Sequence, residues 1–280
     1  MMTEPVARGH LAVVGGTTEH TAFGLLGDVV ARTNELWQAH WVDYPASFGF
    51  PAPYDESKEA GVDELIRLLV RLPADRPIGI VGYSQGAGVV EDAMRRLATS
   101  RDLHEVRCLM QIRYVGTVAS PHRAGGDQVG DDPGGFGISG PLKPFQPMIA
   151  THRLAGVREA VILWEQFVLS GDVIAACPTN SLIRFVEPLV PAMSATNTLR
   201  WARDVQNKLT LTFVLAHFPE LRDWRRLPAL LVRIREAVDL VVAYQQTGVH
   251  MQYARIPIRG KTLPATQWIA RELNEIGWQN

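Results

Sequence analysis

The fold is decided by one stretch of sequence, Pro77-Ile78-Gly79-Ile80-Val81-Gly82-Tyr83-Ser84-Gln85-Gly86-Ala87-Gly88-Val89-Val90. A short apolar run, a serine between two glycines and a helical pattern predict a strand, a tight elbow and a helix, with Ser84 at the tip. Such an elbow holds a nucleophilic serine in a strained turn, and its glycines let the strand and the helix approach without Cβ clashes. Because the chain has nine serines and 24 glycines, chance would supply this Gly-x-Ser-x-Gly pattern only roughly 0.07 times. A glycine-rich turn with a solvated serine is the alternative interpretation.

Strands and helices alternate on both sides of the elbow. The predicted strands cover residues 11–14, 36–42, 106–117 and 162–169, and the predicted helices cover residues 21–32, 57–72 and 264–276. Ser57 is the expected cap of the second helix, and Gly277 is the expected end of the last one. This alternation with short connections predicts an α/β fold with a mostly parallel sheet flanked by helices.

The alternation stops between residues 180 and 247, where apolar spacing predicts helices in 182–193, 201–218 and 230–242. We therefore predict a single domain, residues 1–280, in which 180–247 forms a helical insertion or lid. Arginines interleave with apolar residues in this part of the chain, which is compatible with contact to an amphiphilic surface. An ordinary helix with a solvated basic face is the simpler explanation.

Composition excludes several classes of partner. The formal net charge is −1, from 28 basic and 29 acidic side chains, so nothing in the charge favours binding to nucleic acid. Only two cysteines, Cys108 and Cys177, are present, and we expect both to be free thiols. The glycine-rich segment 124–140 has the composition of a mobile surface loop and lacks both EF-hand and P-loop spacing, so no metal or cofactor is predicted.

The N-terminal residues contain no apolar signal-peptide core, and no run of about 18 apolar residues suggests a transmembrane span. The expectation is a soluble protein made in the cytoplasm without a signal peptide.

A serine hydroxyl needs a histidine to accept its proton and an acid to orient that histidine. Asp172 is the predicted acid because it follows the strand 162–169 in a Gly-Asp turn, whereas Glu165 lies within that strand. The alternative role for Asp172 is to cap a following helix.

The predicted base is His250. Of the eight histidines, six precede Asp172, against the usual order of serine, acid and histidine. His217 ends an apolar helical stretch, where a packing role is simpler. His250 follows the predicted insertion and precedes the last helix, which is the expected place for the base.

The tetrahedral intermediate also needs two N–H donors for its oxyanion. The amide that follows the nucleophile belongs to Gln85 and is the first predicted donor. Thr17, in the Gly15-Gly16-Thr17-Thr18 turn after the first strand, is the second, through its amide or its hydroxyl. The alternative is a glycine turn that merely reverses the chain.

These residues resemble those of a known family. The elbow Gly82-Tyr83-Ser84-Gln85-Gly86 is similar to that of cutinase-like serine esterases of the α/β-hydrolase fold, and in particular to that of mycobacteriophage lysin B enzymes. Further similar features are the insertion before His250 and the segments Tyr44-Pro45-Ala46, Ser120-Pro121-x-Arg123 and Gly171-Asp172. The chain departs from the family at the first turn, where lysin B proteins often carry His-Gly-Thr-Gly.

The resemblance implies an esterase that cuts the ester bond between mycolic acids and arabinogalactan in the host envelope at the end of phage infection. It implies the triad Ser84, Asp172 and His250, a lipid ester as substrate, and contact with the envelope surface. The alternatives are a general cutinase-like or lipase-like carboxylesterase, and a noncatalytic α/β-hydrolase scaffold that binds lipid or a protein.

Overall fold

Five parallel strands form the centre of the molecule. The computed structural model describes residues 8–19, 24–33, 35–47, 51–126, 128–140, 162–185 and 223–279. In their order across the sheet, the strands are β2 (Trp37–Trp41), β1 (Gly9–Val14), β3 (Ile78–Tyr83), β4 (Ile112–Val118) and β5 (Leu163–Phe167). Every neighbouring pair is parallel. The predicted mostly parallel sheet is confirmed.

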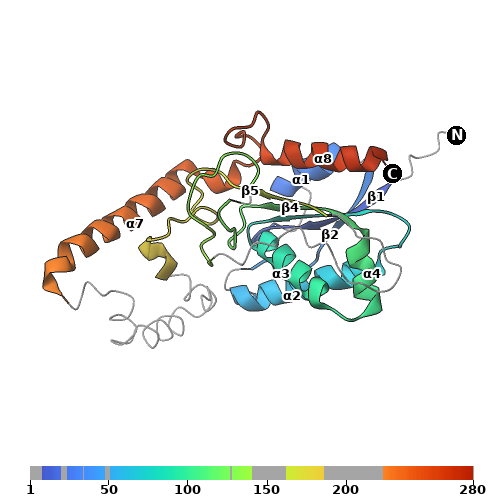
Figure 1. Cartoon of the computed structure of the whole chain (residues 1–280), viewed down its shortest axis with the longest axis horizontal. Helices are drawn as coiled ribbons and strands as arrows, with labels where there is room; N and C mark the ends of the chain where they lie inside the picture. The colour runs from blue at the N-terminus through green and yellow to red at the C-terminus, as the bar shows by residue number, and fades with distance from the viewer. Residues whose placement is uncertain are drawn as a thin grey trace.

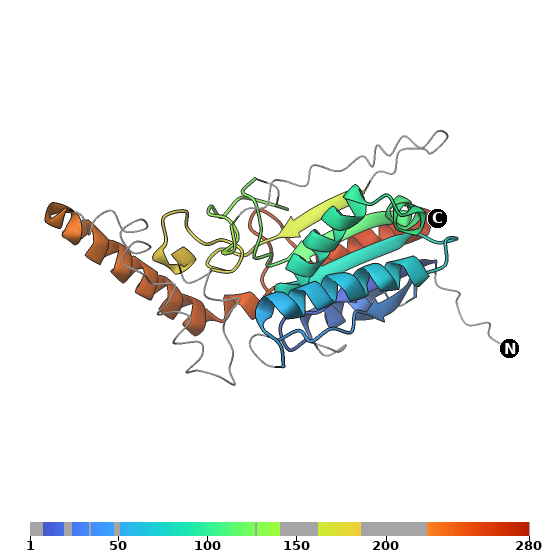
Figure 2. The same ribbon diagram turned by 90° about the horizontal axis from the view of Figure 1, so that it is seen from below.

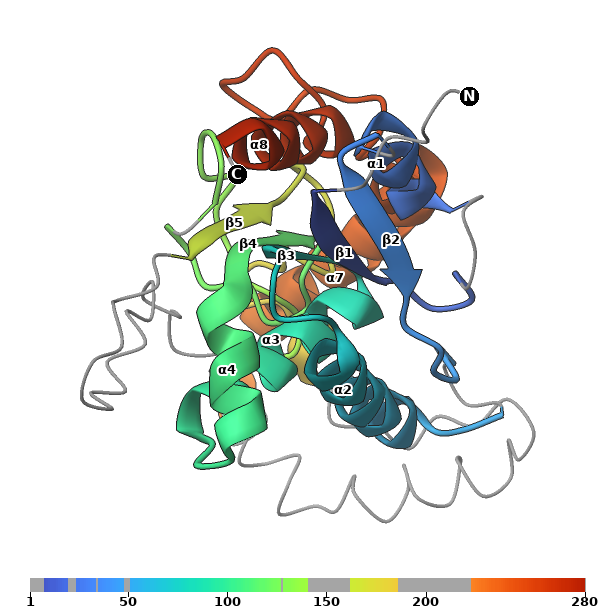
Figure 3. The ribbon, with the colours of Figure 1, turned by 90° about the vertical axis from the view of Figure 1, so that its right-hand side faces the viewer.

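Helices cover both faces of this sheet. Viewed end on, the sheet lies between two groups of helices (Figure 3). The first group is α1 (Leu25–Thr33) and α8 (Ala265–Gln279), and the second is α2 (Tyr54–Arg71), α3 (Gln85–Thr99) and α4 (Leu103–Gln111). The second group lies across the face that is turned to the viewer in Figure 2. With both faces covered, all residues of β1 and β3 are buried, which is why these strands are continuous apolar runs rather than alternating ones.

Each face of the sheet has its own hydrophobic core. Leu65, Val89 and Met94 belong to the core under α2 and α3. Leu26 and Leu273 belong to the core under α1 and α8. Both predicted free cysteines are confirmed as buried free thiols.

The predicted strand 106–117 is wrong in its first half. The helix α4 occupies Leu103–Gln111, and β4 begins only at Ile112. The Asp102 side chain caps this helix by accepting hydrogen bonds from the amides of His104, at 2.8 Å, and Glu105, at 3.2 Å. This cap, together with buried Val106 and Leu109 at helical spacing, outweighs the β-branched residues of the segment.

Two helix boundaries also differ from the predicted ones. The helix α2 begins at Tyr54, before Ser57, whose hydroxyl accepts the Ser47 amide at 3.0 Å instead of capping the helix. The helix α8 continues through Gly277. A Cβ at Gly277 would come within 3.2 Å of Trp37 Nε1, so this glycine permits close packing on β2 rather than ending the helix.

Three helical segments lie in the described part of the predicted insertion 180–247. They are the 3₁₀ turns η1 (Leu182–Phe185) and η4 (Trp224–Arg226) and the helix α7 (Leu227–Thr247). The predicted helix 201–218 lies outside the described residues, as does most of 182–193. The helix α7 projects away from the sheet (Figure 1) and ends at Gly248, whose φ is 54°. Among the described helices, none is long and apolar enough to cross a membrane.

The order of the strands fixes where a site can form. From β1 the chain passes to β2 on one side, and from β3 it passes to β4 on the other. Connections that leave in opposite directions open a crevice at the carboxyl ends of β1 and β3. The Gly15–Thr18 turn and Ser84 follow these two strand ends directly.

Candidate active site

Ser84 occupies the tip of a strained turn between β3 and α3. Its φ of 53° and ψ of −118° lie in a region that non-glycine residues rarely adopt. The turn is held in place because the Ser84 amide donates to Val118 O of β4 at 2.9 Å. Backbone strain of this kind persists only where the surrounding structure over-determines it.

The glycines of the elbow have the packing role that the sequence predicts. A Cβ at Gly82 would come within 2.6 Å of Gly86 O. A Cβ at Gly86 would come within 2.2 Å of Val14 O. Only glycine fits at either position, so β3, α3 and the end of β1 meet at the Ser84 elbow without steric conflict.

The structure brings Ser84, His250 and Asp172 together. His250 Nε2 lies 2.9 Å from Ser84 Oγ, and His250 Nδ1 lies 3.0 and 3.1 Å from the two carboxylate oxygens of Asp172. An ionised carboxylate can only accept hydrogen bonds, so Nδ1 carries the proton and Nε2 is free to accept the proton of Ser84. The Asp172 side chain is fully buried, and that of His250 is 15% exposed.

The Asp172 carboxylate is fixed by donors on both oxygens. Oδ1 accepts the Ile174 amide at 3.0 Å, and Oδ2 accepts the Tyr253 hydroxyl at 2.6 Å. Residues 173–175 form a turn rather than a helix. Asp172 is therefore not a helix cap, and its carboxylate faces His250.

Tyr83, the residue before Ser84, contacts His250 through its hydroxyl and its ring. Its hydroxyl donates to His250 O at 2.8 Å, and the two rings lie 5.1 Å apart, centroid to centroid. Burial raises the pKa of Tyr83 far above its ordinary value, so the phenol remains a donor. His250 sits in η5 (Val249–Met251), directly after α7, and Tyr83 ties this turn to the elbow.

The two predicted oxyanion donors lie beside each other. The Thr17 hydroxyl donates to Gln85 Oε1 at 3.4 Å, which leaves the Thr17 amide as the group to consider. The Gln85 amide is at the first position of α3, where no intrahelical carbonyl is available. In the described part of the chain, neither amide donates to another backbone carbonyl.

Glu19 holds the turn that carries Thr17. Its carboxylate accepts the Gly16 amide at 3.2 Å and the Leu26 amide at 3.0 Å, and Tyr44 donates to Gly15 O at 2.6 Å. Burial raises the pKa of Glu19, and these amide hydrogen bonds oppose the rise. The turn is therefore fixed by long-range contacts as well as by its glycines.

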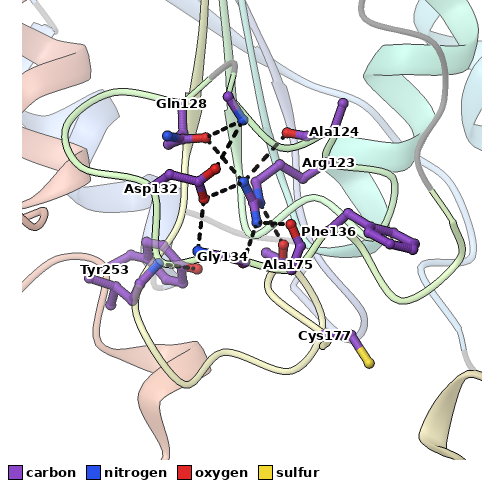
Figure 4. A network of polar contacts seen from close by, with 12 residues as sticks. Arg123, Ala124, Gln128, Asp132, Gly134, Phe136, Ala175, Cys177 and Tyr253 are labelled. Atoms are coloured by element: carbon purple, nitrogen blue, oxygen red, sulfur yellow. Dashed lines mark hydrogen bonds and ion pairs between the residues drawn. The ribbon is translucent and has the colours of Figure 1, made fainter. Parts of the chain in front are cut away.

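Arg123 is the centre of a buried network that supports the acid (Figure 4). Its side chain is 1% exposed. The guanidinium donates to six acceptors, which are Ala175 O at 2.6 Å, Gly134 O and Gly135 O at 2.8 Å, Gln128 Oε1 at 3.0 Å, Asp132 Oδ1 at 3.3 Å and Ala124 O at 3.4 Å. Both the Ala175 and Ala176 amides in turn donate to Asp172 O. The network thus joins the glycine-rich segment 124–140 to the turn that carries Asp172.

The other candidate residues lie elsewhere. His10 and His40 pair with each other, Nδ1 to Nε2 at 3.1 Å, on β1 and β2. His104 is in α4, and His20, His152 and His217 lie outside the described residues. Glu165 on β5 accepts hydrogen bonds from Tyr114 on β4 and from Trp268 on α8. Within the described segments, no group of three or more His, Cys, Asp or Glu side chains could hold a metal ion.

Four supporting residues were not predicted for these roles from the sequence. Tyr253, Tyr83 and Glu19 hold the acid, the histidine and the first turn, and Arg123 appeared only as part of a resemblance. Tyr83 lies inside the elbow motif, and Tyr253 follows His250 by three residues. Closeness in sequence to Ser84 and His250 was therefore the one signal that could have indicated these two tyrosines.

The parallel sheet, the elbow after β3, and Asp172 and His250 after β5 and α7 define an α/β-hydrolase fold. A family model described as the PE-PPE domain matches residues 36–127, which include the elbow. No curated protein matches the chain.

Several solved structures are similar to this chain. Lysin B from mycobacteriophage D29 is 19% identical, with a TM-score of 0.55, over 97% of this chain and 100% of that protein. The catalytic core of an acetyl xylan esterase from Trichoderma reesei is 14% identical, with a TM-score of 0.46, over 71% of this chain and 98% of that one. A cutinase-like protein from Cryptococcus sp. is 14% identical, with a TM-score of 0.42, over 77% of this chain and 97% of that one.

Proposed function

We propose that this chain is a serine carboxylic ester hydrolase in which Ser84, His250 and Asp172 form the catalytic triad. The observation that carries the proposal is the continuous path from Ser84 Oγ through the two ring nitrogens of His250 to a buried carboxylate, with distances of 2.9 and 3.0 Å. This is the arrangement that activates a serine hydroxyl near neutral pH.

The proposed reaction proceeds by acyl transfer. Ser84 Oγ attacks the ester carbonyl carbon while its proton passes to His250 Nε2, and the resulting oxyanion is held by the amides of Gln85 and Thr17. His250 then gives the proton to the leaving alkoxide oxygen, the C–O bond breaks, and an acyl-enzyme remains on Ser84. Water attacks this ester by the same route and releases the carboxylic acid. No metal or cofactor takes part in the proposed steps.

The proposed substrate is the ester between mycolic acids and arabinogalactan in a mycobacterial-type envelope, cleaved during phage lysis. The support is the lysin B resemblance of the elbow and the likeness in fold to lysin B of mycobacteriophage D29 over nearly the whole chain. The enzyme would then act at the envelope surface of the host. The alternative within the same reaction class is a cutinase-like carboxylesterase without a role in the cell wall.

Hydrolysis of p-nitrophenyl butyrate tests the esterase. Ser84→Ala should reduce kcat/KM by at least about 10³-fold, because the nucleophile is lost while binding and the oxyanion donors remain. Glu59→Ala, a change on α2 at a side chain that is 69% exposed, is the control and should retain activity. Equal rates for wild type and Ser84→Ala would exclude Ser84 as the nucleophile.

Two further measurements separate the alternatives. Incubation with purified mycolyl-arabinogalactan-peptidoglycan should release free mycolic acids, whereas a small-ester carboxylesterase should release none. A fluorophosphonate probe should label Ser84 stoichiometrically. A chain that binds lipid without catalysis would remain unlabelled.

A further inference from the structure

We propose that Tyr253 is a positioning residue that acts on the reaction through Asp172. Its hydroxyl lies 2.6 Å from Asp172 Oδ2, the same oxygen that lies 3.0 Å from His250 Nδ1. The inference rests on the proposed function, because it gives Asp172 the role of the triad acid. It adds a fourth side chain to that arrangement.

The direction of the Tyr253 hydrogen bond is determined by its neighbours. The phenol oxygen accepts the Leu169 amide at 3.0 Å, and its single proton has the Asp172 carboxylate as its acceptor. Tyr253 is fully buried, and burial and the Asp172 charge raise its pKa well above the ordinary value. The phenol therefore stays protonated and donates to Asp172 across the working pH range.

This donor fixes the orientation of the acid. The Ile174 amide is bonded to Oδ1 and the Tyr253 hydroxyl to Oδ2, so rotation of the carboxylate would break one of the two bonds. The remaining acceptor directions face His250 Nδ1. A carboxylate held in this way orients the imidazole before substrate binds, which lowers the reorganisation needed during the reaction.

The same hydroxyl joins two loops that are distant in the sequence. Tyr253 follows His250 by three residues, and Leu169 precedes Asp172 by three. One phenol thus fixes the loop after β5 to the loop after α7, and with them the spacing between acid and base.

Tyr253 also moderates the charge that His250 faces. A hydrogen bond from a phenol withdraws part of the negative charge on Oδ2, so the imidazolium is stabilised less than it would be beside an unshared carboxylate. The other titratable or charged groups around this cluster are Tyr83 on β3, Tyr244 on α7, and Glu19 and Arg123 in the loops after β1 and β4. Removing the Tyr253 hydroxyl leaves all of these groups in place.

The test compares Tyr253→Phe with Tyr114→Phe. Tyr114 is also fully buried and donates to a carboxylate, Glu165 Oε2, at 2.9 Å. Its carboxylate belongs to β5 and does not contact the triad. Both variants lose one phenol-to-carboxylate hydrogen bond from the core, and only Tyr253→Phe touches Asp172. Tyr253→Phe also leaves the Leu169 amide without its acceptor, so denaturant titration of both variants accompanies the kinetics and separates a loss of stability from the shift in the pH profile.

The expected result is a loss of about tenfold in kcat for Tyr253→Phe on p-nitrophenyl butyrate, with KM within about twofold of the wild-type value. The acid limb of the kcat/KM profile, which reports the protonation of the free enzyme's base, should move to higher pH. Tyr114→Phe should leave the profile where it is. In an Asp172→Asn background, Tyr253→Phe should cost little more, because both changes act through one contact.

A second variant tests the same inference if Tyr253→Phe does not fold. Difluorotyrosine at position 253 keeps the size of the ring and makes the phenol a stronger donor, so the acid limb should move to lower pH. An unchanged pH profile in the folded Tyr253 variants, or an equal loss with and without Asp172, would overturn the inference. Failure of the proposed function would look different, because Ser84→Ala would then retain activity.

Discussion

Two buried charged residues, Arg123 in the segment that follows β4 and Glu91 on α3, have very different numbers of hydrogen-bond partners. Arg123 is 1% exposed and is surrounded by six acceptors. Glu91 on α3 is 3% exposed. Neither of its carboxylate oxygens makes a hydrogen bond of normal geometry within the described residues, and the same holds for both ring nitrogens of His122. Ser120 lies beside the Glu91 carboxyl but reduces its pKa shift only in part.

A buried charged group affects stability differently when its hydrogen-bond partners are present and when they are absent. A buried charge with all its donors engaged costs little to keep and a great deal to remove, because its partners would be left unsatisfied. A buried carboxyl without partners costs stability whenever it ionises. Arg123 therefore supports the loops that carry the acid, whereas Glu91 and His122 make the packing under α3 dependent on pH.

Replacing Arg123 with methionine should have the largest effect on stability. The change leaves four backbone carbonyls without their donor, and the contacts to two of them, Ala175 O and Ala124 O, are buried. We expect a loss of about 3 to 5 kcal/mol in the free energy of unfolding. Denaturant titration measures this loss. Because Arg123 Nε holds Ala175 O, the turn of Asp172 should also loosen and esterase activity should fall.

Arg123→Lys is the control for charge. It keeps the cation but has three donors on a single atom in place of the planar fork, so it should recover only part of the lost stability. Full recovery by lysine would mean that charge alone, and not the set of carbonyl contacts, accounts for the role of Arg123.

Glu91→Gln tests whether the buried Glu91 carboxyl makes stability depend on pH. Burial raises the pKa of Glu91 from 4.5 to about 7, so the folded state binds a proton that the unfolded state has already lost over this range. Stability then falls as the pH rises from about 4.5 to 7 and is constant above that range. Between pH 5 and pH 8 the Glu91 contribution to this fall is about 2 kcal/mol.

The glutamine variant should lose this part of the pH dependence. Urea titrations of wild type and Glu91→Gln at pH 5 and pH 8 give the difference. His122, whose pKa is lowered by burial and by Lys58, contributes a slope of the opposite sign. That slope is present in both proteins and cancels in the comparison. An identical pH dependence in the two proteins would show that Glu91 finds partners when it ionises.

The contrast also explains what could be predicted from the sequence. Ser84, Asp172 and His250 could be predicted as a candidate triad because the elbow is a local motif and because chain order restricts the choice of the other two. The parallel arrangement of the strands around the elbow could be predicted from the alternation of strands and helices. Both predictions depend on spacing and order along the chain and need no knowledge of long-range contacts.

The supporting contacts could not be predicted in this way. Tyr253 and Asp172 are 81 residues apart in sequence, and no pattern links them. Glu91 lies beside Asp92 on α3, so its sequence context resembles that of an exposed helix face. The helix α4 was mistaken for a strand because apolar residues at its end run directly into β4. In each case the missing information is which surfaces meet, which depends on the whole fold.

The smallest effect is expected at Asp132, the exposed partner of Arg123 in this network. Asp132 is 39% exposed, and it accepts the Gly134 amide at 2.9 Å as well as the Arg123 guanidinium at 3.3 Å. Asp132→Asn keeps an acceptor for these two donors. It loses the acceptor of the exposed Gly126 amide, which water can replace, and a charge that solvent already screens, so the free energy of unfolding should fall by no more than about 1 kcal/mol. Denaturant titration at low and high salt measures the loss, which should shrink as salt is added. A loss as large as that of Arg123→Met would mean that ion pairing, rather than the buried carbonyls, holds the loop of the acid in place.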